Sequence, residues 1–201
     1  MIKNLVFDFG KVLVDYDFDH VTRTFFDNEE DFRQFDDYIC SPEFVALCDL
    51  EPEPMPVLVE RMKREQPQFA LQWQFFYDRY IDFVTGEVPG MRDMLRRLKA
   101  EGFHVYGLSN WCSLVYPVME KYPIFRELEG CVISSELHCV KPDPAIYQEL
   151  FRRFDLRPEE CVFTDDKEAN VLGAEKVGMR AILFENPVQF EHELRLLLAS
   201  F

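Results

Sequence analysis

Short apolar runs alternate with helical segments along the second half of this chain, and no other feature limits the possible folds as much. The sequence predicts strands at 103–108, 130–134, 160–164 and 180–184, and helices at 91–100, 144–153, 168–177 and 190–199. An N-terminal run at 2–7 adds a further strand. Strands that alternate with helices predict an α/β fold with a doubly wound parallel sheet, in which binding sites lie beyond the carboxyl ends of the strands.

A different pattern interrupts the chain between Asp15 and Gly86. This segment is rich in aromatic and charged residues, has apolar groups at helical spacing and contains no strand-like run. Closely spaced prolines in the range 52–56 cannot continue a helix and separate two helical parts. We therefore expect a core domain of residues 1–14 and 87–201, and a small helical cap domain of residues 15–86.

Composition excludes several classes of partner. With 22 basic and 37 acidic residues the formal charge is −15, which repels nucleic acid and anionic lipid. No stretch approaches the length needed to cross a bilayer, and the six cysteines have no metal-binding spacing, so we expect a cytoplasmic protein with reduced thiols. We expect no nucleic-acid or membrane partner, and the sequence does not separate a monomer from a homodimer.

Polar residues follow the apolar runs at the predicted strand ends. Asp8 follows the first run, Ser109 the second and the Asp165-Asp166 pair a later one, while Lys141 stands before a proline. Carboxylates brought this close together repel one another unless a hard cation such as Mg²⁺ lies among them. The alternatives are ordinary: the acidic pair caps the next helix, Ser109 belongs to a turn, and Lys141 is a solvated loop residue.

Four segments in this order resemble the motifs of the haloacid dehalogenase superfamily of phosphohydrolases. They are Phe7-Asp8-Phe9-Gly10-Lys11-Val12-Leu13, Leu108-Ser109-Asn110, Lys141-Pro142-Asp143-Pro144 and 163–171. The resemblance covers essentially the whole chain and implies a Rossmann-like core. A helical insert after the first motif is similar to the C1-cap subgroup, and the first motif is similar to that of a branch linked to sugar-phosphate hydrolysis, with α-D-glucose 1-phosphate as an example.

The resemblance implies a role for each motif residue. Asp8 would attack phosphorus and form an aspartyl-phosphate, while Lys141 would offset the charge of both groups. Ser109 and Asn110 would hold the phosphoryl oxygens, and Trp111 would touch the substrate. Cap aromatic residues would either line the cleft or form the cap core: Trp73, Phe75, Phe76, Tyr77 and Tyr80.

The resemblance also implies the ligands of a magnesium ion. They would be Asp8, the backbone carbonyl of Gly10 and Asp166. We prefer Asp166 over Asp165 because it stands four residues before Asn170, which matches the family's fourth motif. Asp165 would then be a ligand through water or would orient the others.

Gly10 departs from the family pattern. Most phosphatases of this family have a second aspartate at this position as the general acid, and its loss typically costs about 10²–10⁴-fold in rate. Lys11, which follows, is expected to face solvent or to form a structural ion pair. Asp15 and Asp17 stand where the chain enters the cap, and we consider either of them as a substitute acid.

The leading hypothesis is a Mg²⁺-dependent phosphomonoesterase that acts on a small phosphorylated metabolite, with sugar phosphates as one expected class. One alternative is a 2-haloacid dehalogenase, in which Asp8 attacks carbon, although the Asp165-Asp166 pair adds charge that such a site does not need. The other is a phosphate-binding or regulatory protein that lost turnover together with the acid at Gly10.

Overall fold

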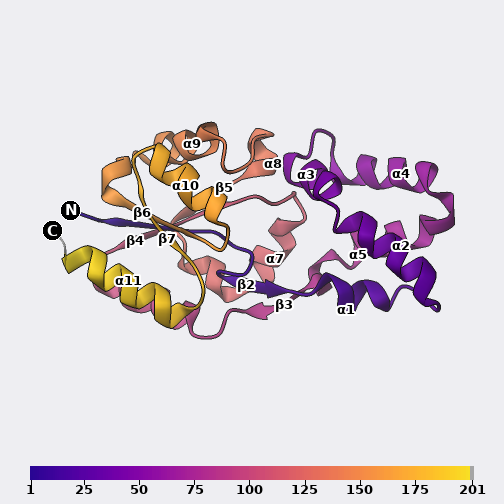
Figure 1. Ribbon diagram of the computed structural model, residues 1–201, viewed down its shortest axis with the longest axis horizontal. Coiled ribbons are helices and arrows are strands. Elements are labelled where there is room, and N and C mark those ends of the chain that lie inside the picture. The colour runs from indigo at the N-terminus through magenta and orange to yellow at the C-terminus, as the bar shows by residue number, and fades with distance from the viewer. Residues whose placement is uncertain (200–201) are drawn as a thin grey trace.

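The computed structural model describes residues 1–199, and these residues form two lobes that lie one after the other along the longest axis (Figure 1). One lobe is an α/β core that contains the N-terminus and the last helix. The other lobe contains helices from the first half of the chain. This is the predicted fold class, a parallel sheet with surrounding helices and a small helical cap.

The core contains a five-stranded sheet in the order β5-β4-β1-β6-β7. All neighbouring strands in it pair in parallel. The strands are β1 (Asn4–Phe7), β4 (His104–Ser109), β5 (Gly130–Ile133), β6 (Cys161–Asp165) and β7 (Arg180–Leu183). Each falls on a run predicted from the sequence, and β1 lies at the centre of the sheet.

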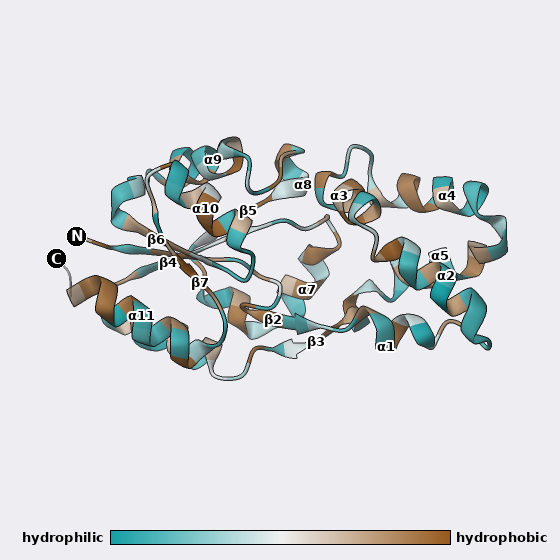
Figure 2. Cartoon of the chain, viewed as in Figure 1, coloured by the Kyte–Doolittle hydropathy of each residue, from teal (hydrophilic) through white to brown (hydrophobic). Residues whose placement is uncertain are grey.

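Helices cover both faces of the sheet because successive strand residues point to opposite sides. Leu5 and Phe7 belong to one cluster of buried residues, which includes residues of α6 and α11, whereas Val6 belongs to a second cluster with residues of α9 and α10. Figure 2 shows apolar residues concentrated on the strands between these helices. The core helices are α6 (Met91–Ala100), α7 (Val115–Lys121), α8 (Ser134–Leu137), α9 (Pro144–Phe154), α10 (Glu168–Lys176) and α11 (Pro187–Ala199), with 3-10 turns η3 (Pro123–Glu127) and η4 (Pro158–Glu160).

Local signals set several helix ends. Asp143 is the N-cap of α9, and its carboxylate accepts a hydrogen bond from the Ala145 amide at 2.8 Å, as the sequence predicts. Helices α6 and α10 are followed by Gly102 and Gly178, whose φ angles of 97° and 93° lie in the left-handed region that favours glycine. After each of these helix ends the chain turns and enters the next strand, β4 after α6 and β7 after α10.

The cap is built around Trp73, whose side chain is fully buried. Its ring centroid lies 4.7 Å from that of Phe35 and 5.3 Å from that of Phe44. Trp73 therefore belongs to the cap core and not to a cleft. The cap elements are α1 (Phe18–Arg23), α2 (Glu29–Ile39), α3 (Pro42–Leu50), α4 (Met55–Glu65), η1 (Pro67–Phe69), α5 (Ala70–Asp78) and η2 (Tyr80–Phe83).

An antiparallel ribbon joins the two lobes. It pairs β2 (Val14–Tyr16) with β3 (Val84–Glu87), so both crossings between core and cap lie side by side. The sequence-based expectation of no strand within 15–86 is wrong here, because strands of three and four residues are too short to produce a readable two-residue period. The domain boundaries proposed at residues 15 and 86 fall inside this ribbon.

Within residues 1–199 no helix has the length and apolar character that crossing a bilayer requires. The six cysteines are free thiols.

Candidate active site

The carboxyl ends of three adjacent strands bring the predicted polar residues together. Phe7 at the end of β1 pairs with Gly107 of β4 on one side and with Thr164 of β6 on the other. Asp8 follows directly, and its amide donates a hydrogen bond to the Thr164 carbonyl at 2.9 Å. Asp8 therefore lies at the centre of the sheet edge, between the ends of β4 and β6.

Lys141 forms the centre of a buried ionic network. Its ammonium donates hydrogen bonds to Asp8 Oδ1 at 2.8 Å, to Asp165 Oδ2 at 2.6 Å and to the Leu108 carbonyl at 2.8 Å. The lysine side chain is fully buried, so all three donors of the ammonium are used by the protein. The solvated-lysine alternative does not describe this residue. Two nearby carboxylates raise the Lys141 pKa despite its burial, and the group stays cationic.

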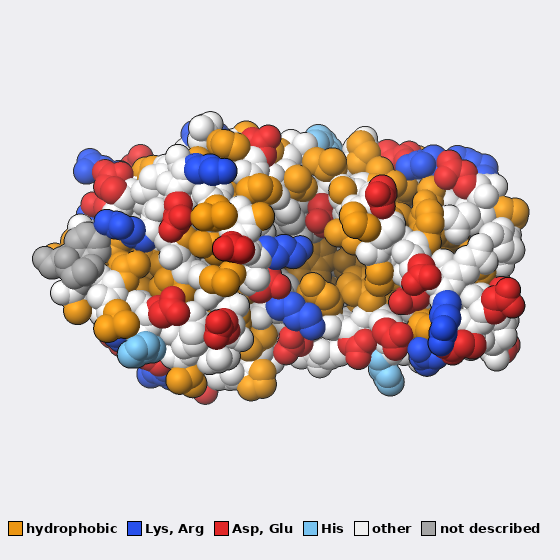
Figure 3. All heavy atoms as spheres, in the orientation of Figure 1, with side chains coloured by type: hydrophobic (Ala, Val, Ile, Leu, Met, Phe, Trp, Pro, Cys, Tyr) orange, Lys and Arg blue, Asp and Glu red, His pale blue; other side chains and the backbone are white. Residues whose placement is uncertain are grey.

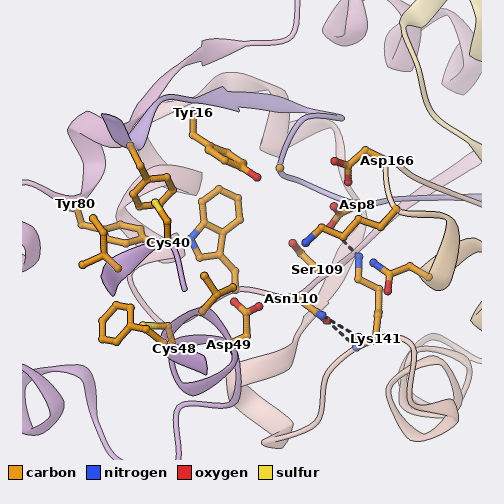
Figure 4. Close-up of a pocket in the computed structure, with 18 of the residues that line it drawn as sticks. Asp8, Tyr16, Cys40, Cys48, Asp49, Tyr80, Ser109, Asn110, Lys141 and Asp166 are labelled. Carbon is orange, nitrogen blue, oxygen red and sulfur yellow. Dashed lines mark hydrogen bonds and ion pairs between the residues drawn. The ribbon is translucent and has the colours of Figure 1, made fainter. Parts of the chain in front are cut away.

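Asn110 holds the Lys141 backbone in place. Its side-chain amide donates to the Lys141 carbonyl at 3.0 Å, and its side-chain oxygen accepts from the Lys141 amide at 2.7 Å (Figure 4). The Asn110 side chain thus positions Lys141. These two bonds use one of its two amide hydrogens and one lone pair of its oxygen, and Asn110 also lines the cavity, so its contact with phosphoryl oxygens stays a prediction.

Three carboxylates form a cluster that could hold a cation. Oxygen atoms of Asp8, Asp165 and Asp166 lie within 4.8 Å of one another. Both Asp165 oxygens are already engaged, by Lys141, by the Asn170 amide at 3.0 Å and by the Lys167 backbone amide at 2.8 Å. Asp166 is half-buried, lines the cavity and forms no ion pair within the described chain.

This donor set fits a hard divalent cation. Carboxylate and carbonyl oxygens are the ligands that Mg²⁺ prefers. Asp8 keeps one oxygen outside its ion pair with Lys141, and Asp166 and Gly10 line the same side of the cavity. Burial raises the pKa of Asp166 and the neighbouring Asp165 adds to the rise, while Lys167 and Lys141 oppose it. Asp165 is the least suited to bind a cation because its oxygens have other partners.

Burial is also the main influence on Asp8. It raises the pKa of this carboxyl to about 6, the Lys141 ammonium opposes the shift, and the charge of Asp165 adds to it. The side chain is 11% exposed, so a small molecule can reach it from the cavity. Asp8 is thus a carboxylate held by one lysine and open on its other side.

Ser109 has a buried hydroxyl with no partner. Its residue is 1% exposed, and its Oγ has no hydrogen-bonding atom within reach. A buried hydroxyl without a partner costs free energy, so its presence beside Asp8 indicates a ligand that completes its bonding. An oxygen-rich anion such as phosphate fits this requirement.

Tyr16 fills the space beside Gly10. A Cβ atom at Gly10 would lie only 2.8 Å from Tyr16 Cε1, so a larger residue at this position requires the Tyr16 ring to move. The Tyr16 hydroxyl points toward Asp8 and Asp166 (Figure 4). Burial and the nearby carboxylates raise the Tyr16 pKa to about 12, so the phenol keeps its proton. Sequence reasoning missed Tyr16, because its contact with Gly10 depends on the β2 ribbon.

The residues considered as substitute acids lie elsewhere. The Asp17 carboxylate accepts from the His20 amide at 2.9 Å and caps α1. Asp15 forms an exposed ion pair with Lys11 at 3.5 Å, and the Lys11 ammonium also donates to the Tyr16 carbonyl at 2.8 Å. The cavity-lining residues include neither Asp15 nor Asp17. The hypothesis that one of them replaces the acid is therefore not supported.

A cavity of about 300 Å³ separates the sheet edge from the cap. Figure 3 shows it as a hollow near the middle of the molecule, with hydrophobic side chains in its walls. Trp111 forms part of the wall, and its indole donates a hydrogen bond to the Tyr80 hydroxyl at 2.6 Å. The lining residues are Asp8, Gly10, Tyr16, Phe18, Ile39, Cys40, Phe44, Val45, Cys48, Asp49, Phe76, Tyr80, Ser109, Asn110, Trp111, Lys141, Asp166, Lys167 and Asn170.

The cap contributes a carboxyl group that sequence reasoning missed. Asp49, in the last turn of the cap helix α3, points into the cavity (Figure 4). Burial raises its pKa to about 6, Lys167 and Lys141 oppose this shift, and Asp8 adds to it. Nothing in the local sequence distinguishes this residue from a surface aspartate, because its position depends on how the cap meets the core.

Comparisons with known proteins identify relatives. The family model "haloacid dehalogenase-like hydrolase" matches residues 2–178. A D-ribitol-5-phosphate phosphatase from Bacteroides thetaiotaomicron is 26% identical over 232 aligned positions, which cover all of both chains. Flavin mononucleotide hydrolase 1 from Arabidopsis thaliana is 30% identical over 99 residues, which are 49% of this chain and 40% of that protein. The (S)-2-haloacid dehalogenase 4A of Burkholderia cepacia is 29% identical over 51% of this chain and 46% of its own length.

Solved structures share the fold. A HAD family enzyme from Bacteroides thetaiotaomicron, determined with magnesium and inorganic phosphate, superposes with a TM-score of 0.77. The match has 20% identity and covers 93% of this chain and 96% of that one. A predicted HAD-like hydrolase from Porphyromonas gingivalis gives the same TM-score at 22% identity over 98% of both chains.

Proposed function

The chain belongs to the haloacid dehalogenase-like hydrolases, and from this premise we propose that it is a Mg²⁺-dependent phosphatase of small phosphate monoesters. One observation carries the proposal: the Asp8 carboxylate, the Lys141 ammonium and the unpartnered Ser109 hydroxyl meet at one wall of a cavity. These groups are a nucleophile, a fixed positive charge and a hydrogen-bond donor for a phosphoryl group.

In the proposed reaction, an oxygen of Asp8 attacks phosphorus and forms an aspartyl-phosphate as the alcohol leaves. Water then attacks the same phosphorus, and Asp8 is released. Asp165 binds the Lys141 ammonium, and the Asn110 side chain binds the Lys141 backbone. The positive charge of Lys141 is therefore already positioned beside the phosphoryl group on which negative charge develops. Ser109 donates to a phosphoryl oxygen.

Asp8, Asp166 and the carbonyl of Gly10 would hold the magnesium ion. When bound, the ion offsets the charge of the carboxylates and of the substrate. Asp165 and Asn170 orient the cluster without needing to bind the ion themselves, because their mutual hydrogen bonds already fix the Asp165 carboxylate.

The substrate class has support at a coarse level. Relatives that match the chain include phosphatases of ribitol 5-phosphate and of other small phosphorylated molecules. We propose that the substrate is a small phosphorylated metabolite, with sugar phosphates as one candidate class. We also propose that the protein is a soluble enzyme of the cytoplasm. The acidic cluster argues against dehalogenase chemistry, because displacement of halide by one carboxylate has no use for two further carboxylates.

The test measures phosphate release from p-nitrophenyl phosphate with and without Mg²⁺, and halide release from a chloroalkanoic acid. We expect Mg²⁺-dependent phosphate release that disappears in Asp8→Asn and survives in Asp37→Asn, an exposed position on α2. Mass spectrometry of acid-quenched protein should detect one phosphoryl group on Asp8. Halide release without phosphate release would refute the proposal in favour of a dehalogenase, and inactivity toward both would favour a binding protein.

A further inference from the structure

The cap side of the cavity is apolar. Its lining residues include Phe18, Ile39, Phe44, Val45 and Phe76, and these form the hydrophobic hollow visible in Figure 3. The two basic lining residues, Lys141 and Lys167, both belong to the core. Asp49 is the one charged lining residue that the cap supplies from the described chain. The alcohol part of a substrate, which must lie on this side when its phosphate meets Asp8, therefore faces apolar groups and a carboxyl.

This lining disfavours two kinds of substrate. A second anionic group would meet Asp49 and would find no cation on the cap side. A polyol would give up water around several hydroxyls for few partners, which weakens binding unless each hydroxyl is rebonded. The Tyr80 hydroxyl already accepts from Trp111, so it offers little capacity for this.

We propose that the substrate is the phosphate monoester of an uncharged, mainly apolar alcohol, aliphatic or aromatic. The inference rests on the proposed phosphatase function, and within the small phosphate monoesters it selects against sugar phosphates, the candidate class named above. It predicts that contacts with the alcohol part of the substrate add to the binding affinity. It also predicts weaker binding of sugar phosphates and of substrates with a second anionic group.

Two matched pairs of compounds test this proposal. Cyclohexyl phosphate and myo-inositol 1-phosphate share one ring and differ in hydroxyls, while ethyl phosphate and phosphoglycolate differ in one carboxylate. Calorimetry with Asp8→Asn protein and Mg²⁺ measures binding without turnover. We expect the first member of each pair to bind at least about tenfold more tightly, a difference of about 1.4 kcal/mol. Val45→Asn should reduce the cyclohexyl preference, and Val57→Asn, on an exposed face of α4 away from the cavity, should not.

Equal or tighter binding of the inositol ester or of phosphoglycolate would overturn the substrate class. Failure of the proposed function has a different signature: the wild-type protein would bind the preferred esters but release no phosphate from any of them. The two failures are therefore distinguishable.

A second inference concerns the missing general acid. Gly10 carries no side chain, and Tyr16 occupies the space that an aspartate would need there. The proposed reaction still requires a proton for the leaving oxygen when the alcohol is a poor leaving group. With the position at Gly10 filled by Tyr16, another element must supply the acid, and the cap faces the leaving group, which points away from Asp8 during in-line attack.

Asp49 meets this geometric requirement. It lines the cavity from the cap helix α3, with its carboxyl directed into the pocket, and this carboxyl forms no hydrogen bond or ion pair with other described residues. The charged and titratable groups that face it are Asp8, Lys141 and Lys167 of the core and the phenol of Tyr16 on β2. Two buried or half-buried thiols also lie near it, Cys48 on its own helix and Cys112 after β4.

The core holds the Asp49 segment at three consecutive residues. Ser134 Oγ donates to the Asp49 carbonyl at 2.6 Å, and His138 Nδ1 lies 2.8 Å from the Leu50 carbonyl. The Glu51 carboxylate accepts from the Ser113 amide at 2.5 Å and from its hydroxyl at 2.7 Å. The backbone that carries the Asp49 side chain is thus held in place relative to the core nucleophile, which keeps this carboxyl at the cavity as general acid catalysis requires.

We infer that Asp49 is the proton donor and acceptor of the reaction. As the Asp8–phosphorus bond forms, the bond between phosphorus and the leaving oxygen breaks. Its electron pair stays on that oxygen, which takes the proton of the Asp49 carboxyl. Water then attacks phosphorus and gives a proton to the Asp49 carboxylate. The Asp8–phosphorus bond breaks, and its electron pair returns to Asp8. The burial that raises the pKa of Asp49 to about 6 supports both directions of transfer.

The test compares leaving groups. Asp49→Asn should lower the rate with cyclohexyl phosphate by about 10²–10⁴-fold and the rate with p-nitrophenyl phosphate by less than about tenfold, because nitrophenolate leaves without a proton. In the wild-type protein kcat/KM for the cyclohexyl ester should fall as pH rises through about 6, and this fall should be absent in Asp49→Asn. Asp49→Glu should recover part of the activity.

Equal losses on both esters, or no loss, would overturn the role of Asp49. Asp37→Asn, an exposed aspartate on α2, is the matched control. Wild-type inactivity toward p-nitrophenyl phosphate would instead count against the proposed phosphatase function, since that ester does not depend on the acid.

Discussion

Replacing Asp49 with asparagine should stabilise the protein at neutral pH. The folded protein raises the pKa of this carboxyl from 3.8 to about 6, mainly by burying it where no cation pairs with it. The unfolded chain has no such burial. Between these two pKa values the folded state therefore binds more protons than the unfolded state, and the free energy of unfolding falls as pH rises.

The size of the effect follows from the shift. About two pKa units at 1.36 kcal/mol each give at most about 3 kcal/mol, reached once the pH exceeds about 6. Asparagine has a similar size and no charge, so Asp49→Asn removes this penalty. The stability difference between variant and wild type should be near zero at pH 4, grow as pH rises to 6 and stay constant above pH 7.

Urea unfolding followed by circular dichroism between pH 4 and pH 8, without divalent cations, measures this difference. Asp37→Asn, at an exposed position of α2, should change stability by less than about 0.5 kcal/mol throughout. The reasoning is refuted if Asp49→Asn is no more stable than the wild type at pH 7, or if its advantage does not depend on pH.

Four further predictions concern other parts of the site. Gly10→Asp should lower both the melting temperature and the activity, because a Cβ atom at this position lies 2.8 Å from Tyr16 Cε1. Adding Tyr16→Ala should restore much of the melting temperature. A Gly10→Asp protein that is as stable as the wild type would contradict this packing. Lys141→Met leaves Asp8 and Asp165 buried without their cation, so urea unfolding should show a loss of about 3–5 kcal/mol, against a negligible change for Lys176→Met on the surface. Mg²⁺ at 100 times its dissociation constant should stabilise the wild-type protein by about 2.7 kcal/mol in thermal unfolding. The same Mg²⁺ concentration should stabilise the Asp166→Asn protein by clearly less. Equal stabilisation of the two proteins would show that Asp166 is not a ligand of the ion. Val45→Lys places an ammonium four residues before Asp49 on α3, so it should lower the Asp49 pKa. Turnover of cyclohexyl phosphate should then fall more than turnover of p-nitrophenyl phosphate. An unchanged pH profile would contradict an ion pair between the new lysine and Asp49.

The core of this protein is readable from its sequence because its signals are local. Each core strand contains a short run of mainly apolar residues, and glycine or an Asp-Pro pair marks the adjoining helix ends. Once these strands are taken as parallel, Ser109 and Asp165 at the ends of β4 and β6, and Asp8 directly after β1, must lie at one edge of the sheet. The roles assigned to these residues remain predictions.

The cap side of the site is not readable in this way. Asp49 reaches the cavity because core residues hold its segment over sequence separations of 62 to 88 residues. Tyr16 reaches Gly10 because β2 pairs with β3 across the whole cap. Neither contact leaves a periodic or spacing signal in the sequence. The same limit explains why the substitute acid was sought at Asp15 and Asp17, which are near Gly10 along the chain but outside the cavity.

Stability and proton transfer at Asp49 are two consequences of one environment. A cation paired with this carboxyl would stabilise the folded protein, but it would also hold the group ionised and without a proton to give. Burial raises the pKa of Asp49 more than Lys167 and Lys141 lower it, and the carboxyl keeps a proton available at the cavity. Tyr16 fills the space next to Gly10, so an aspartate introduced there must displace the Tyr16 ring. In the proposed mechanism the glycine beside Tyr16 on the core side is therefore accompanied by an unpaired carboxyl on the cap side, and burial of that carboxyl lowers the stability of the folded protein above about pH 6.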